Sequence, residues 1–150
     1  MIYAEKLGST MPRKVLLNIL HDAQKKEGFL SEETLKKISA EQNIPISHLY
    51  GVASFYHMLY TKKQGKHILC ICGSPSCVLN DGKTIEKFLE SELKIKIGET
   101  TPDGLITVYK TSCIGCCDEA PAMLVDELPE TKLTIPKIRA IIKKLKGKKK

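Results

Sequence analysis

The sequence contains no tryptophan, and aromatic residues make up 5% of the chain. It has two arginines, Arg13 and Arg139, although its formal net charge is +7. Base recognition and base stacking rely on arginine and aromatic side chains, so their scarcity argues against nucleic-acid binding. Much of the positive charge lies near the C-terminus, in a lysine-rich stretch typical of a solvated helix end or tail. This stretch contains Lys137, Lys143, Lys144, Lys146 and Lys148 to Lys150.

Sequence features of several other protein classes are also missing. No apolar run approaches the roughly 20 residues that span a bilayer. Residues 1 to 6 lack the basic-then-apolar order of a signal peptide. We therefore expect a cytoplasmic protein without direct membrane insertion. No Gly-x-Gly-x-x-Gly string or phosphate-binding loop occurs, so no nucleotide-binding motif is evident.

The hydrophobic pattern changes near residue 65, which predicts two parts: a helical segment over 1–65 and an α/β domain over 66–150. The polar stretch 62–66 serves as the linker between them. In the first part we expect a helix over 12–27 and a second one capped by Ser31. A third helix is expected to start at Ser47 and to carry Leu49, Val52, Ala53, Tyr56 and Leu59.

The second part has the pattern of a small α/β domain. The run His67-Ile-Leu-Cys-Ile-Cys72 is almost continuously apolar, which predicts a strand buried on both faces. The remaining pattern predicts helices packed against a sheet, with a basic tail at the end. The elements expected after the first strand are a helix over 82–94, strands over 105–109, 122–125 and 132–134, and a helix over 136–146.

Four of the six cysteines form two pairs, Cys72-Gly-Ser-Pro-Ser-Cys77 and Cys113-Ile-Gly-Cys-Cys117. In a cytoplasmic protein, clustered cysteines more often bind metal or carry redox chemistry than form disulfides. Cys72 is expected to end the first strand, and Cys77 to lie in the loop before the next helix. Cys113 and Cys117 are expected between the second and third strands. Loops at strand ends leave such side chains free to converge.

The spacing alone leaves three hypotheses open. Four thiolates suit zinc and iron–sulfur centres equally well. The string Cys113-Ile-Gly-Cys116 also fits a redox dithiol, but that leaves Cys72, Cys77 and Cys117 unexplained. A Rieske-type centre would need two histidines in the cysteine loops. The four histidines are scattered elsewhere and are interpreted as surface or helix-packing residues: His21, His48, His57 and His67.

The combination of Cys-x₄-Cys, 35 further residues, and Cys-Ile-Gly-Cys-Cys-Asp-Glu-Ala-Pro resembles a known family. It is similar to the thioredoxin-like [2Fe–2S] subunit (NuoE-like) of NADH dehydrogenases (complex I). The same subunit type occurs in NAD-linked and electron-bifurcating hydrogenases and in formate dehydrogenases. The resemblance covers about Leu16 to Leu145 and includes the blocks Ile44-Pro45, Leu49 to Tyr56, and Gly98 to Gly104.

The resemblance implies an α+β protein, in which a three-helix N-terminal segment precedes a thioredoxin-like [2Fe–2S] ferredoxin domain. One [2Fe–2S] cluster would be ligated by Cys72, Cys77, Cys113 and Cys117. FMN and NAD(H) would lie on a partner (NuoF-like) subunit, and a further iron–sulfur or hydrogenase subunit would complete the complex. The chain would carry single electrons without being catalytic alone, and its N-terminal helices would dock on the flavoprotein.

The choice of parent complex rests on composition. Lysine-rich, arginine-poor usage is associated with AT-rich genomes of anaerobes, and it slightly favours a soluble or electron-bifurcating hydrogenase. Respiratory NADH:quinone oxidoreductase and formate dehydrogenase are the alternatives. A structural zinc-binding assembly module is the alternative from a different functional class.

Residues beside the proposed ligands have two interpretations each. Cys70 is expected to be a buried free thiol, and Cys116 either a small apolar loop residue or an additional ligand or redox partner. Asp118 and Glu119 follow the last proposed ligand directly. Their negative charge would lower the potential of a cluster, or it is simply the polarity of a solvated loop.

Overall fold

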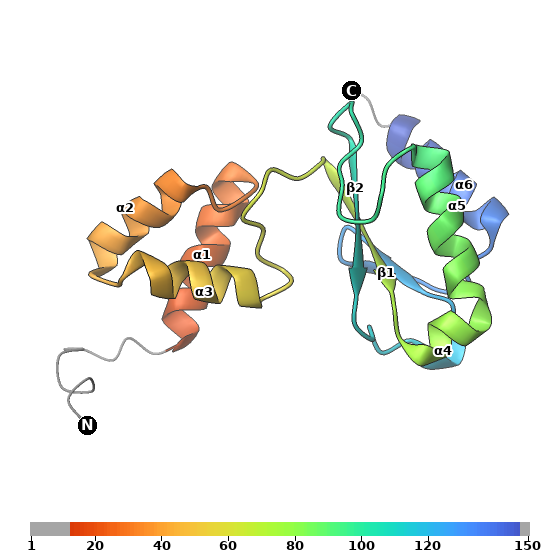
Figure 1. The fold of residues 1–150 in the computed structure, drawn as a ribbon, viewed down its shortest axis with the longest axis horizontal. Helices are drawn as coiled ribbons and strands as arrows, with labels where there is room; N and C mark the ends of the chain where they lie inside the picture. Colours follow the sequence, from red (N-terminus) through yellow and green to blue (C-terminus); the bar gives the residue numbers. More distant parts are fainter. Residues whose placement is uncertain (1–12, 148–150) are drawn as a thin grey trace. The chain divides into compact units, whose positions relative to one another are not determined.

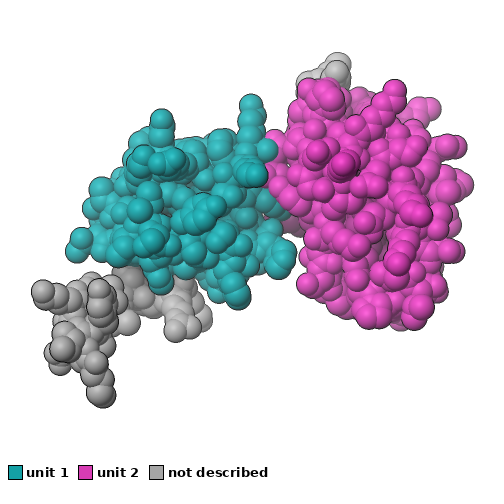
Figure 2. All heavy atoms as spheres, in the orientation of Figure 1, with its two compact units in different colours: residues 1–63 teal, residues 64–150 magenta. Residues whose placement is uncertain are grey.

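The structure is a computed structural model that describes residues 13–147. The chain forms two compact units, unit 1 (Met1–Lys63) and unit 2 (Gln64–Lys150), which Figure 2 shows in different colours. Within residues 13–147, no helix is both long and apolar enough to cross a membrane. The segment 1–6 and the expected basic tail at 148–150 lie outside the described residues.

Unit 1 is built from helices around an apolar core (Figure 1): α1 (Arg13–Glu27), α2 (Glu32–Gln42) and α3 (Ile46–Phe55). Ser31 caps α2 as its sequence position predicts, because its Oγ accepts a hydrogen bond from the Thr34 N–H at 3.1 Å. Asn43 ends the same helix in the left-handed conformation. The buried core consists of Leu16, Leu20, Leu30, Leu35, Ile38, Leu49, Ala53 and Leu59.

The third helix is shorter than the sequence suggested. It ends at Phe55, so the expectation that it continues to Leu59 was wrong. Leu59 is buried all the same, because the chain after α3 folds back onto α1. The Gln24 side chain in α1 binds the segment that follows α3. Its Nε2 donates to the Met58 carbonyl at 2.7 Å, and its Oε1 accepts from the Tyr60 N–H at 2.6 Å.

Unit 2 contains a four-stranded sheet in the order β2-β1-β3-β4. Its strands are β1 (His67–Cys72), β2 (Ile106–Thr111), β3 (Met123–Val125) and β4 (Leu128–Glu130). β1 and β2 pair in parallel, whereas β3 pairs antiparallel with both β1 and β4. The expected strand over 132–134 was wrong. The chain reverses directly after β3 because Asp126 and Glu127 both adopt positive φ, as a tight hairpin turn requires.

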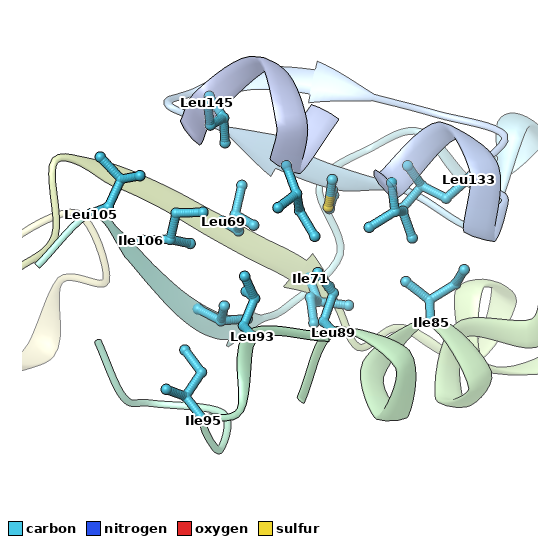
Figure 3. Packing of buried hydrophobic residues seen from close by; sticks show 14 residues of the cluster. Leu69, Ile71, Ile85, Leu89, Leu93, Ile95, Leu105, Ile106, Leu133 and Leu145 are labelled. Atoms are coloured by element: carbon cyan, nitrogen blue, oxygen red, sulfur yellow. The ribbon is translucent and has the colours of Figure 1, made fainter. Parts of the chain in front are cut away.

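Two helices cover one face of this sheet, α5 (Lys83–Leu93) and α6 (Ile135–Gly147). Both pack into one core with alternate residues of β1 and β2, including Leu69, Ile71, Ile106 and Val108 (Figure 3). The intervening β1 residues Ile68 and Cys70 are only half-buried. The expectations of a strand buried on both faces and of a buried Cys70 were therefore wrong, because both helices pack on the same side.

We predict that Leu89→Ala destabilises unit 2 by about 2–5 kcal/mol, since this fully buried α5 side chain would leave a cavity. Urea unfolding of the full chain measures the loss. Leu79→Ala makes the same chemical change at a side chain that is 84% exposed, and it should alter the free energy of unfolding by no more than about 0.5 kcal/mol. Equal losses in the two variants would contradict this account of the core.

Candidate metal centre

Parallel pairing of β1 and β2 sends both cysteine loops out of the same end of the sheet. Cys72 is the last residue of β1 and lies opposite Thr111, the last residue of β2. Cys113 follows Thr111 by two positions. Figure 1 shows β1 running at this end into the short helix α4 (Pro75–Cys77). The two cysteine pairs, 41 residues apart in the sequence (72 to 113), thus start from neighbouring positions.

The first pair is buried. Cys72 and Cys77 are 3% and 1% exposed, and they pack together with Ala122. Cys77 ends α4 instead of lying in an irregular loop, since Pro75 occupies the first helical position, where its missing N–H costs nothing. The backbone of Cys72 is fixed as well, because its N–H donates to the Ala122 carbonyl at 3.1 Å.

The second pair is exposed. Cys113 and Cys117 both face solvent, and their Sγ atoms are 3.2 Å apart. Gly115 turns the chain between them at φ +87°, a conformation that glycine adopts without strain. Cys117 begins the short 3₁₀ turn η2 (Cys117–Glu119). Because the Cys113 thiol contacts Cys117, this loop does not favour the Cys113–Cys116 dithiol.

A side-chain hydrogen bond joins the two cysteine loops. The Ser76 hydroxyl, in α4, donates to the carbonyl of Cys117 at 3.0 Å. The thiols also interact electrostatically across the loops: Cys113 chiefly raises the pKa of Cys117, and Cys77 and Cys72 add to that effect. The two pairs thus lie at the same end of the sheet, one buried and the other exposed.

The two thiols of the first pair, Cys72 and Cys77, differ in the direction in which their pKa values are shifted. Burial alone would raise the pKa of Cys72, but hydrogen bonds with the Ser74 hydroxyl and with the Ser74 and Ile114 amides lower this pKa to about 7. The pKa of Cys77 is raised, first by burial and then by its hydrogen bond with Cys72. The site therefore stabilises a thiolate at Cys72, which is the form that binds metal.

The donor set fits a binuclear iron–sulfur cluster. A [2Fe–2S] cluster takes four cysteine thiolates, two for each iron, and the site supplies two cysteine pairs. A structural zinc ion would instead need all four donors around one point.

The structure bears on the interpretation of three further residues, Glu119, Cys116 and His67. Glu119 is paired with Lys132 at 2.8 Å and accepts from Thr131 at 2.7 Å, and both contacts lower the pKa of its carboxyl. Its charge is thereby compensated, which weakens the hypothesis that it lowers a cluster potential. Cys116 is half-buried and packs against the buried cysteines, as a small apolar residue would. His67 is buried and paired with Asp126 at 2.6 Å, so it is not a surface residue.

Sequence reasoning missed two residues that shape the site, Ser76 and Gly82. Gly82 ends the irregular turn η1 (Val78–Gly82), which follows α4. A Cβ added at Gly82 would lie 2.4 Å from the carbonyl oxygen of Cys77. The close approach of these two backbone segments depends on the three-dimensional path of the turn, so no local sequence signal marks it.

This fold, with two cysteine pairs at one end of its sheet, is typical of the class of thioredoxin-like iron–sulfur proteins. Residues 4–146 match the model of the family described as thioredoxin-like [2Fe–2S] ferredoxin. The chain belongs to this family, whose cofactor is a [2Fe–2S] cluster.

Curated relatives come from two kinds of complex. The chain is 34% identical over 135 residues to a subunit of the NADH-quinone oxidoreductase of Escherichia coli, covering 90% of this chain and 81% of that one. It is 35% identical over 134 residues to the alpha subunit of the NAD-reducing hydrogenase HoxS of Cupriavidus necator, covering 89% of this chain and 22% of that subunit.

A solved structure shares the fold. A chain of an NAD⁺-reducing [NiFe]-hydrogenase superposes with a TM-score of 0.77 at 23% sequence identity. The match covers 89% of this chain and 23% of the hydrogenase chain. This likeness extends over both units of the sequence and concerns the fold alone.

We predict that Gly82→Ala impairs cluster retention. The added methyl group would collide with the Cys77 backbone, so Cys77 must move away from its position. After reconstitution of the full chain, iron release to a chelator should be at least several-fold faster than in the wild type. Gly147→Ala is the matched control, since a Cβ there meets no atom within 4 Å. Equal release rates in the two variants would contradict a role for this close approach.

Proposed function

We propose that this chain is an electron-transfer subunit that carries one [2Fe–2S] cluster on Cys72, Cys77, Cys113 and Cys117. It exchanges single electrons with the flavin, FMN, of a partner subunit that binds NAD(H). The parent assembly is an NAD(P)H-linked oxidoreductase, and the chain is not catalytic by itself. The observation that carries the proposal is the meeting of two cysteine pairs at one end of the sheet in a chain of this family.

The two cysteine pairs would hold a [2Fe–2S] cluster from different sides. When bound, a [2Fe–2S] cluster supplies a one-electron redox couple. Cys72 and Cys77, which are buried, would hold such a group from within the protein. Cys113 and Cys117, which are exposed, would hold it where a partner can exchange an electron with it. The hydrogen bond from the Ser76 hydroxyl to the Cys117 carbonyl joins α4 to the loop of the second cysteine pair.

Unit 1 supports a docking role. Helix α3, Ile46-Ser-His-Leu-Tyr-Gly-Val-Ala-Ser-Phe55, contains no Asp, Glu, Lys or Arg. Its exposed side and the residues just after it carry Tyr50, Phe55 and Met58, which are more than half exposed. Tyr50 also lines a hollow of about 490 Å³, together with Leu35 and Ile46 among others. Exposed apolar patches of this kind mark protein interfaces, and we assign this one to the flavin-binding subunit.

For the parent complex we favour an NAD-linked hydrogenase, soluble and located in the cytoplasm, on the basis of the lysine-rich composition. Respiratory NADH:quinone oxidoreductase and formate dehydrogenase use the same subunit type. The curated relatives from a quinone reductase and from a hydrogenase are equally similar, at 34% and 35% identity. Purification of the native complex and identification of its other subunits decides between them, and a further iron–sulfur or hydrogenase subunit is expected there.

We predict that Cys72→Ser and Cys117→Ser each strip or destabilise the cluster, because serine oxygen replaces a soft thiolate. Iron and sulfide analysis, visible absorption and EPR of the anaerobically prepared chain measure the loss. The wild type should hold about two irons and two sulfides per chain. Cys116→Ala is the control and should load normally.

Two outcomes would contradict the ligand assignment. One is full cluster retention in both serine variants together with loss in Cys116→Ala. The other is a colourless wild-type protein that contains one zinc ion, which would support the structural zinc module instead.

We also predict that Phe55→Lys weakens binding to the flavin-binding subunit about 30-fold, since a buried aromatic anchor typically contributes about 2 kcal/mol or more at an interface. Titration of the purified partner measures the affinity, and cluster content should stay unchanged. Leu128→Lys places the same charge on an exposed leucine of β4 and is the matched control. Loss of affinity in the control, with none in Phe55→Lys, would assign docking to unit 2.

A further inference from the structure

Ser74 occupies a helix N-cap position without making the usual cap bond. It directly precedes α4, has extended φ and ψ, and its carbonyl accepts from the Val78 N–H at 2.9 Å. An N-cap serine normally also accepts a backbone N–H through its side-chain oxygen. No such bond forms here, although Ser31 makes it at the start of α2. The Ser74 hydroxyl therefore serves another purpose.

The partner of this hydroxyl is a cysteine sulfur. Ser74 Oγ lies 3.3 Å from Cys72 Sγ, and in the thiol form Cys72 donates this bond. Ser74 is only 8% exposed, so water gives its side chain little compensation. A thiol is a weak donor, so its hydrogen bond compensates little of the cost of burying the Ser74 hydroxyl. A metal-bound thiolate is charged and accepts hydrogen bonds strongly, so the hydroxyl would rotate and donate to it.

Ser74 lies in the sequence between both cysteines of the first pair. Its position is fixed by β1, which ends at Cys72, and by α4, which begins directly after Ser74 and ends at Cys77.

We propose that the Ser74 hydroxyl donates a hydrogen bond to the Cys72 thiolate and thereby raises the reduction potential of the cluster. This inference rests on the proposed function, because it assumes Cys72 as a ligand. Reduction adds one negative charge, part of which falls on the ligand sulfurs. A donor proton interacts more strongly with the more negative sulfur and so favours the reduced state. Ser74 is a positioning and tuning residue with no redox chemistry of its own.

The test is the midpoint potential of Ser74→Ala, measured by EPR-monitored redox titration of the reconstituted full chain. We expect reduction to become about tenfold less favourable, a shift of ~59 mV to lower potential for one electron. Ser74→Thr retains the hydroxyl and should restore the wild-type potential. Ser112→Ala removes an exposed hydroxyl next to Cys113 and should leave the potential unchanged.

A second measurement uses the unmutated protein and so remains informative if Ser74→Ala does not load. In resonance Raman spectra, iron–sulfur stretching bands should shift between H₂O and D₂O, because an exchangeable proton contacts a ligand sulfur. Bands that do not shift would overturn the inference, as would a loaded Ser74→Ala variant with the wild-type potential. A wild-type chain that takes up no iron and sulfide contradicts the proposed function as well, so the two failures are distinguishable.

Discussion

The parallel register of β1 on β2 is the constraint on which the whole site depends. It places Cys72 opposite Thr111, so that the chain leaves both strands at the same end and at the same level. Parallel pairing also requires a long crossover, which α4, η1 and α5 supply. That crossover carries Cys77 on its first turn, while the continuation of β2 carries Cys113 and Cys117. A slip of one residue would turn Cys72 to the opposite face of the sheet.

Burial then makes the two pairs unequal. Cys72 and Cys77 lie in a small apolar cluster with Ala122, and the Ser74 hydroxyl is hydrogen-bonded to Cys72. Cys113 and Cys117 are exposed, and their segment is held by the Ser76 hydrogen bond to Cys117 and by the contacts of Glu119, the last residue of η2, with Thr131 and Lys132. A cofactor held by both pairs would be protected by the protein at Cys72 and Cys77 and accessible at Cys113 and Cys117. This is the arrangement that an electron carrier needs if it is to keep its cluster and still meet a partner.

Local patterns predicted the elements whose signals are local. The first strand was expected over His67–Cys72 and observed there, and Ser31 caps α2 as its position indicated. The predictions were wrong where contacts between residues far apart in the sequence determine the structure. Leu59 is buried by a chain reversal tied to Gln24 and not by a longer helix. Cys70 is half-exposed because both long helices of unit 2 pack on the same face of the sheet, an arrangement that a single apolar strand cannot encode.

The sequence by itself determined the family, through the spacing of the cysteines and the blocks around them, because these are properties of residue order alone. It also identified which thiols to propose as ligands. Only the tertiary structure decided which pair is buried, that Glu119 forms an ion pair with Lys132, and that Gly82 and Ser74 approach the first pair. These features depend on segments that meet through strand register and helix packing. Burial and hydrogen bonding arise only after such segments are brought together in space.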